Sequence, residues 1–200
     1  MHERDDSVDE YLALAARWVV EDGLDYASAK QRAARALGWG ARAPRPDNAA
    51  LEQAVCQHIA LYCPQEQAQA LRALRELALH WMRRLAVFRP HVGGAVWRGT
   101  ATWHSDIELQ LFCDDSKAAE LHLLDQGLPF TVSQTRGFHG QIVDVLTLTT
   151  ACPGRREPVH LHLAVYDYDD LRGALKSTAR GSWRGDASAL ERLLAQAEAS

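Results

Sequence analysis

The sequence contains no apolar run near the roughly 20 residues that a membrane-spanning helix needs. Its opening, M-H-E-R-D-D, is acidic and lacks the apolar centre of a signal peptide. Cysteine is scarce: there are four, and none forms a C-x-x-C pair. Cys56 and Cys63 are about 10 Å apart along an expected helix, whereas a disulfide needs α-carbons within about 7 Å. We therefore expect a reduced, cytoplasmic protein.

A strong net charge is also missing, since the formal charge is −4 at pH 7, which does not indicate nucleic-acid binding. The basic residues are unevenly spread, however. The segment from Lys30 to Arg45 holds five bases and no acid, and the segment from Arg172 to Arg184 holds four bases. Each segment is either a solvated face or a surface for RNA.

Helical patterns dominate the N-terminal third. Capping signals at Ser7, Asp47 and Pro64 start apolar stripes with helical spacing. These patterns predict helices at about 7–22, 25–37, 48–63 and 64–88. The first two helices form either an accessory cap or a surface that binds a partner or a second copy. We expect three regions: residues 1–63 as a helical region, 64–170 as the core and 171–200 as a helical tail.

Strand patterns follow. Val92 to Trp97 is a short apolar run, and Ile107 to Phe112 alternates apolar and polar residues with the period of a half-buried strand. Further strand-like runs are predicted at 130–135, 142–149 and 159–166, after a helix at about 117–126. The order predicts an α+β fold with a small mixed sheet, helices on one face and the acidic face left open.

Two carboxylates stand out beside a glycine-rich turn. Asp106 and Glu108 are two residues apart, so on a strand both project to the same side. The preceding Gly93-Gly94 lets backbone amides approach a ligand closely, because no β-carbon intervenes. Magnesium takes hard oxygen ligands, usually one or two carboxylates with phosphate and water. This stretch therefore predicts a divalent cation carrying phosphates.

The pattern V92-G93-G94, followed by D106-I107-E108-L109, resembles the signature of the nucleotidyltransferase superfamily, whose fold is shared with DNA polymerase beta. The similarity in element order runs from about Gln65 to Tyr168. A second register places Gly94-Ala95 at the Gly-Ser position and lacks the serine hydroxyl. The resemblance implies a nucleoside triphosphate substrate, Mg²⁺ or Mn²⁺, and transfer of a nucleoside monophosphate to a hydroxyl acceptor of unknown identity.

The resemblance also implies roles for particular residues. Asp106 and Glu108 would hold the metal ions, and Asp144 would be the third carboxylate, since an acid among apolar neighbours needs either solvent or a cation. The candidates for contacts to the triphosphate are Gly93, Gly94, Arg98, Thr100 and Ser105. His104 is a further candidate for a phosphate or acceptor contact.

Several alternatives stay open. The fold is also compatible with a catalytically inactive regulatory or toxin–antitoxin component, or with an RNA-directed enzyme. His160 and His162 form an H-x-H pair that is either half of a zinc site or part of the active-site floor near Asp144. Trp97 and Trp103 either stack on a base or pack the turn.

Overall fold

The computed structural model describes residues 2–40, 43, 45–171 and 182–198. The chain divides into two compact units, residues 1–69 with 102–104 and residues 70–101 with 105–200. The predicted helix after Leu171 and most of the basic segment from Arg172 to Arg184 lie outside the described residues. None of the four cysteines forms a disulfide, as expected for Cys56 and Cys63. No helix within the described ranges is long and apolar enough to cross a bilayer.

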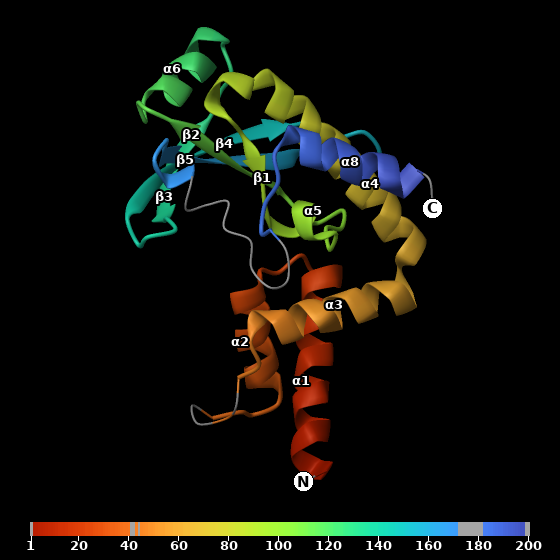
Figure 1. The fold of residues 1–200 in the computed structure, drawn as a ribbon. Coiled ribbons are helices and arrows are strands. Elements are labelled where there is room, and N and C mark those ends of the chain that lie inside the picture. Colours follow the sequence, from red (N-terminus) through yellow and green to blue (C-terminus); the bar gives the residue numbers. More distant parts are fainter. Residues whose placement is uncertain (1, 41–42, 44, 172–181, 199–200) are drawn as a thin grey trace. The chain divides into compact units, whose positions relative to one another are not determined.

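The N-terminal unit contains helices α1 (His2–Glu21), α2 (Tyr26–Ala36) and α3 (Asn48–Tyr62) and the start of α4 (Pro64–Arg84) (Figure 1). Asp47 caps α3 by accepting the backbone N–H of Ala50 at 2.8 Å, as predicted. The predicted start of α1 at Ser7 is wrong, because the helix continues upstream through residues that include no glycine or proline. Half of the buried core residues of this unit are alanines, and Tyr11 stacks on Trp39 at 4.5 Å between ring centroids.

The second unit contains a mixed five-stranded sheet of order β1-β2-β5-β4-β3. Its strands are β1 (His91–Val92), β2 (Ile107–Cys113), β3 (Thr131–Arg136), β4 (Ile142–Thr150) and β5 (Val159–Asp167). Strands β2 and β5 are parallel, and the other neighbouring pairs are antiparallel. The predicted α+β class with a small mixed sheet is confirmed.

The first predicted strand is wrong beyond Val92. Only His91 and Val92 pair with β2, and Gly94–Arg98 forms the short helix α5. The backbone N–H of Gly93 makes a last bond to the carbonyl of Glu108 at 3.0 Å. Gly94 then takes a φ of +61° and turns the chain away from the sheet, a conformation that glycine adopts without strain. The apolar run of Ala95 to Trp97 is thereby helical.

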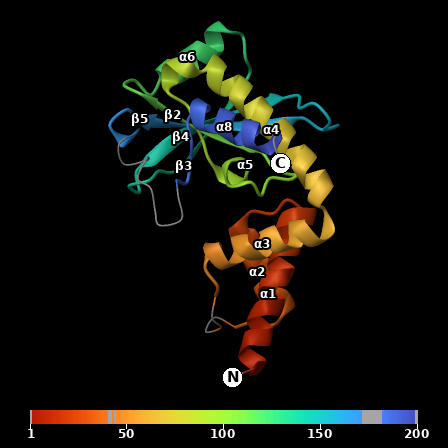
Figure 2. The ribbon, with the colours of Figure 1, turned by 45° about the vertical axis from the view of Figure 1, so that its right-hand side comes forward.

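Helices cover one face of the sheet. Helix α4 and helix α8 (Ala187–Glu198) lie side by side across it in both views (Figures 1 and 2), and Arg83 of α4 pairs with Glu191 of α8 at 2.7 Å. A hydrogen bond links the end of α4 to the end of helix α6 (Ala118–Asp125): Nε of Arg84 donates to the side-chain oxygen of Gln126 at 2.9 Å. Strand alternation gives this helix-covered face the leucines that the structure buries, namely Leu109, Leu111, Leu161 and Leu163.

The opposite face is polar over much of its area, and we call it the acid-bearing face. The strand registers place on it Glu108 and Gln110 of β2, His160 and His162 of β5, and Thr147 and Thr149 of β4. At its far end a small apolar cluster forms around Phe112, Val143 and Tyr166. Strand β3 forms the edge of the sheet next to β4, and all six of its residues are exposed.

A buried arginine secures helix α5. Arg75 of α4 donates from Nε to the carbonyl of Val96 at 3.1 Å and from Nη2 to that of Trp97 at 3.4 Å, and these carbonyls lie near the end of α5, where helical carbonyls lack partners. Arg75→Met should lower the free energy of unfolding by about 2 kcal/mol, because two buried carbonyls lose a charged donor. Urea denaturation measures the change.

The matched control is Arg72→Met on the same helix. Arg72 makes an exposed pair with Glu76 at 2.9 Å, and such pairs contribute about 0.5 kcal/mol or less. Equal losses in the two variants would contradict the role assigned to Arg75.

Candidate functional site

Strands β2 and β5 position the two acids. Asp106 lies just before β2, and its Oδ1 accepts the backbone N–H of His160 at 3.1 Å. Its Oδ2 lies 3.6 Å from Nε2 of His162. Glu108 is paired in register with His162 and is exposed. Both acids therefore lie at the seam between the two parallel strands, on the acid-bearing face.

The surroundings of Asp106 favour its charged form. Partial burial alone would raise the pKa of its carboxyl group. The nearby His162 side chain and the hydrogen bond from the backbone of His160, together with the charges of both imidazoles, outweigh that effect and lower the pKa of Asp106 below its ordinary value. Asp106 is thus held ionised and oriented, which suits a cation ligand.

The glycine turn lies directly against the acid strand. A β-carbon on Gly94 would lie 2.8 Å from Cδ of Glu108, and one on Gly93 would lie 2.9 Å from Nε2 of Gln110. Gly94 also has a positive φ, a backbone conformation that disfavours a side chain, and a side chain there would push the Glu108 carboxylate aside. The backbone of the glycine turn and the carboxylate of Glu108 are therefore in close proximity.

Asp144 does not join these acids. It pairs in register with Gln134, while its neighbour Val145 pairs with Ala164 on the acid-bearing face. Alternation along β4 therefore places Asp144 on the helix-covered face. There it accepts from Nε2 of Gln134 at 3.0 Å and lies 3.8 Å from Nζ of Lys117. The prediction that Asp144 completes the carboxylate set is wrong, because the acid is compensated locally on the other side of the sheet.

Some of the residues predicted to contact phosphate lie next to the acids, and others lie at or beyond the end of α5. Ser105 adjoins Asp106, and its carbonyl accepts from Nη1 of Arg155 at 3.1 Å. Arg98 ends α5, at the far end from the glycines, and Thr100 follows it with only 4% of its surface exposed. The structure therefore keeps Gly93, Gly94 and Ser105 next to the acids. Thr100 is buried, and the contact predicted for it stays a prediction.

His104 and Trp97, from the segment that links the glycine turn to β2, contact residues that are distant in the sequence. His104 belongs to the N-terminal unit, where a β-carbon on Gly23 would lie 2.6 Å from its Cβ. The indole of Trp97 donates to the carbonyl of Ser182 at 2.8 Å and packs on Gly185. Trp97 therefore packs against residues 182–185, and neither role considered for it, stacking on a base or packing the turn, is tested by these contacts.

The histidine pair His160 and His162 lies beside Asp106, whereas one of the sequence predictions placed it near Asp144. His162 lies between Asp106 and Thr147, whose hydroxyl is 2.9 Å from its Nδ1. The H-x-H spacing on a strand signalled a shared face but contains no information on register, and the pair lies beside Asp106 and not beside Asp144. Within the described residues, no group of three or more His, Cys, Asp or Glu side chains could hold a metal ion. The zinc half-site therefore has no completion there.

Asp106 and Glu108 suit a divalent cation that binds together with a phosphate-bearing ligand. Magnesium is commonly held by one or two carboxylates, with substrate phosphates and water filling the remaining positions. Asp106 and Glu108 supply such a pair from one strand, and Asp106 is already oriented by the backbone of His160. A third carboxylate is not among the described neighbours of this pair. The donor set thus suits one phosphate-bound Mg²⁺ or Mn²⁺.

Next to the site, His91 is buried and its Nδ1 lies 2.9 Å from the carbonyl of Arg89. Burial lowers the pKa of His91, although the hydrogen bond to Arg89 and the charge of Asp186 oppose the shift. The neutral ring is favoured in the fold, so its contribution to stability is present above the unfolded pKa of about 6.5. That contribution is lost as the pH falls through the lower folded pKa.

We therefore expect the difference in unfolding free energy between the wild type and His91→Gln to shrink between pH 7.5 and pH 5, as measured by urea denaturation at several pH values. A difference that stays constant over this range would contradict the assignment.

Comparison with known proteins finds solved structures to which this chain is similar. No family model matches the sequence, and no curated protein matches it. The chain is similar to Cid1 bound to the UTP analogue UMPNPP, with 14% identity, 50% of this chain and 31% of that chain covered, and a TM-score of 0.32. For Cid1 with its short product ApU, the identity is 15%, the alignment covers 54% of this chain and 32% of that chain, and the TM-score is 0.33. For a structure of a cytoplasmic RNA terminal U-transferase, the identity is 16%, the alignment covers 50% of this chain and 31% of that chain, and the TM-score is 0.31.

The chain thus spans about a third of the length of these solved structures and aligns over about half of its own. The likeness concerns fold alone, in proteins described as a poly(U) polymerase and an RNA terminal uridylyl transferase. Any conclusion about the chemistry of this chain therefore rests on its own residues.

Proposed function

We propose that this chain binds a nucleoside triphosphate with Mg²⁺ or Mn²⁺ at Asp106 and Glu108 and transfers the nucleoside monophosphate to a hydroxyl acceptor. The observation that carries the proposal is the contact between the glycine turn and the acid strand, with Gly94 directly against the carboxylate of Glu108. Carboxylates for a cation and a side-chain-free turn for phosphates are thereby adjacent on an exposed sheet face.

In this reaction the acceptor oxygen attacks the α-phosphorus, and pyrophosphate leaves. The bound cation would neutralise phosphate charge. Asp106, kept ionised and fixed by the His160 backbone, would bind the cation together with Glu108. Gly93 and Gly94 leave room for phosphate oxygens, and Ser105 lies next to Asp106 as a further polar group.

One observation favours a second candidate, a nucleotide-binding protein that regulates a partner and transfers nothing. The family resemblance implies three carboxylates, whereas Asp144 lies on the opposite face and is compensated by Lys117. A site with two acids would bind the metal–nucleotide complex, while activation of the acceptor hydroxyl would be weak.

An RNA acceptor receives less support from the basic segment that begins at Lys30. Lys30 donates to Asn48 at 2.8 Å, and Arg32 pairs with Asp22 at 2.9 Å. These two side chains are engaged within the N-terminal unit. RNA is therefore tested as one acceptor among others.

The test uses the full chain with each of the four α-³²P-labelled nucleoside triphosphates, with Mg²⁺, Mn²⁺ or EDTA. Acceptors are an RNA oligonucleotide with a free 3′ hydroxyl and the protein itself, and calorimetry with a non-hydrolysable triphosphate measures binding in parallel. Metal-dependent label transfer or pyrophosphate release supports the enzyme. Metal-dependent binding without either supports the regulatory candidate, and no metal-dependent binding refutes both.

A further inference from the structure

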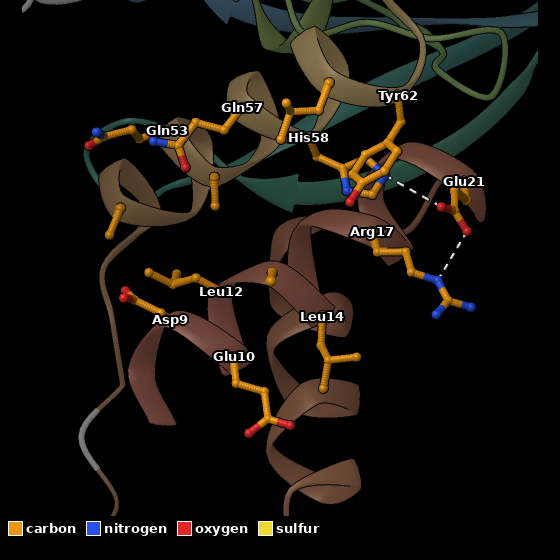
Figure 3. A pocket seen from close by; sticks show the side chains of 14 residues that line it. Asp9, Glu10, Leu12, Leu14, Arg17, Glu21, Gln53, Gln57, His58 and Tyr62 are labelled. Atoms are coloured by element: carbon orange, nitrogen blue, oxygen red, sulfur yellow. Dashed lines mark hydrogen bonds and ion pairs between the residues drawn. The ribbon is translucent and has the colours of Figure 1, made fainter. Parts of the chain in front are cut away.

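The N-terminal unit has an open groove between α1 and α3, with a volume of about 970 Å³. Figure 3 shows its walls, with Asp9, Leu12 and Leu14 from α1 and His58 and Tyr62 from α3. The groove lies wholly within this unit and contains none of the residues assigned to the nucleotide site.

The α3 wall is a continuous stripe on one helix face, whereas the α1 wall combines Leu12, Ala13 and Leu14 with four charged residues. The α3 wall follows the spacing i, i+3, i+4, i+7, i+8, i+11, i+12 and comprises Ala50, Gln53, Ala54, Gln57, His58, Leu61 and Tyr62. Leu61 is 74% exposed and Tyr62 is 73% exposed. Such a stripe covers about three turns, or roughly 18 Å at 1.5 Å per residue. The stripe is mixed, since Gln53, Gln57 and His58 are polar. A helix normally turns apolar positions such as Leu61 and Tyr62 toward another helix.

The small residues in the groove leave room for a close approach. Ala13 of α1 and Ala50 and Ala54 of α3 contribute no bulk beyond a methyl group. Packed helices approach to about 8–10 Å between axes, with the distance set by the side chains at the contact. The alanines would therefore let the backbone of an additional helix come close over the junction of α1 and α3, which pack directly on each other beneath the groove.

Charge is unequal along the groove. At one end Glu21 pairs with Arg17 at 3.1 Å, and Nε2 of His58 lies 3.4 Å from its other carboxylate oxygen. At the other end Asp9 and Glu10 are exposed, and no ion pair is described for them among the residues whose side chains the structure places. The groove thus has an acidic end and an apolar, neutralised end.

We propose that this groove docks an amphipathic helix of a partner protein, with an apolar stripe on the alanine-lined floor and Lys or Arg residues at the end that meets Asp9 and Glu10. In helix-in-groove recognition the bound helix uses anchors at i, i+3, i+4 and i+7, and the α3 wall has the same spacing. Groove-to-groove pairing of two copies is disfavoured, because it brings the Asp9 and Glu10 carboxylates of both chains together.

The test measures binding of the full chain to a fluorescein-labelled peptide of about 15 residues, roughly four helical turns. One peptide carries a leucine stripe flanked by lysines, and its matched partner carries glutamates in place of the lysines. The lysine peptide should bind at least about tenfold more tightly by fluorescence anisotropy. Asp9→Lys combined with Glu10→Lys should remove or reverse that preference.

Ala13→Trp, at an exposed helix position, should fill the groove and weaken the lysine peptide by about tenfold or more. Asp125→Lys on α6 is the control for a general change in charge and should leave binding unaltered. Circular dichroism confirms that each variant is folded. The proposal is overturned by equal binding of both peptides, by an Ala13→Trp variant that binds as the wild type does, or by a wild-type dimer in sedimentation that Ala13→Trp dissociates.

Discussion

Glu108→Gln is expected to abolish magnesium-dependent nucleotide binding and to lower any nucleotidyl transfer by at least about 100-fold. Losing even an outer hydrogen-bond partner of a metal ligand typically costs about 10–100-fold, and a charged ligand should cost more. Asp106→Asn should have a similar effect, since Asp106 precedes Glu108 by two residues on the same face, at the same strand seam. Calorimetry with magnesium and a non-hydrolysable triphosphate gives the binding, and labelled transfer gives the activity.

Asp144→Asn is the matched control. It removes an acid from the same sheet, but from the helix-covered face, where Lys117 and Gln134 are its partners. Nucleotide binding should be unchanged, and only a small loss of stability is expected from a partly exposed pair. If Asp144→Asn eliminates binding as Glu108→Gln does, the placement of Asp144 on the helix-covered face is contradicted.

Gly94→Ala should both destabilise the protein and disturb the site. The new methyl group would lie within 3.0 Å of three atoms of the Glu108 carboxylate, in a backbone conformation with a φ of +61°. A non-glycine residue held in a sparsely populated region costs about 1–3 kcal/mol, and the displaced Glu108 should weaken metal–nucleotide binding as well. Thermal unfolding and calorimetry report the two effects separately.

Gly93→Ala is the neighbouring comparison. Gly93 has extended backbone dihedrals that any residue adopts. Its added methyl group would meet the flexible end of Gln110 at 2.9 Å, which can move aside. The loss of stability should be clearly smaller than for Gly94→Ala. An equal or larger loss in Gly93→Ala would show that crowding, and not the left-handed conformation, limits this turn.

Local signals in the sequence were sufficient for much of the fold. Asp47 and Pro64 correctly marked helix starts, and the alternation from Ile107 onward correctly marked the acid strand. The pairing of Asp106 with Glu108 required only strand periodicity and the position of the strand, both of which are local.

The site residues that failed depended on non-local information. A shift of one residue in register moves a strand residue to the other face, so nothing local to Asp144 reveals which side of the sheet it occupies. The run from Ala95 to Trp97 was too short to separate strand from helix by periodicity. Thr100 is polar, yet the fold buries it, which a polarity pattern does not predict.

The bond from the backbone of His160 to Asp106 has a kinetic consequence. It joins residues 54 positions apart in the chain, through a parallel pairing that must close over the whole β3–β4 hairpin. Closing so long a loop costs entropy before any contact rewards it, whereas the hairpin joins neighbouring segments. The acids should therefore be among the last parts of the second unit to reach their final geometry. A nascent chain that ends before β5 carries both carboxylates and the glycine turn without the strand that orients them.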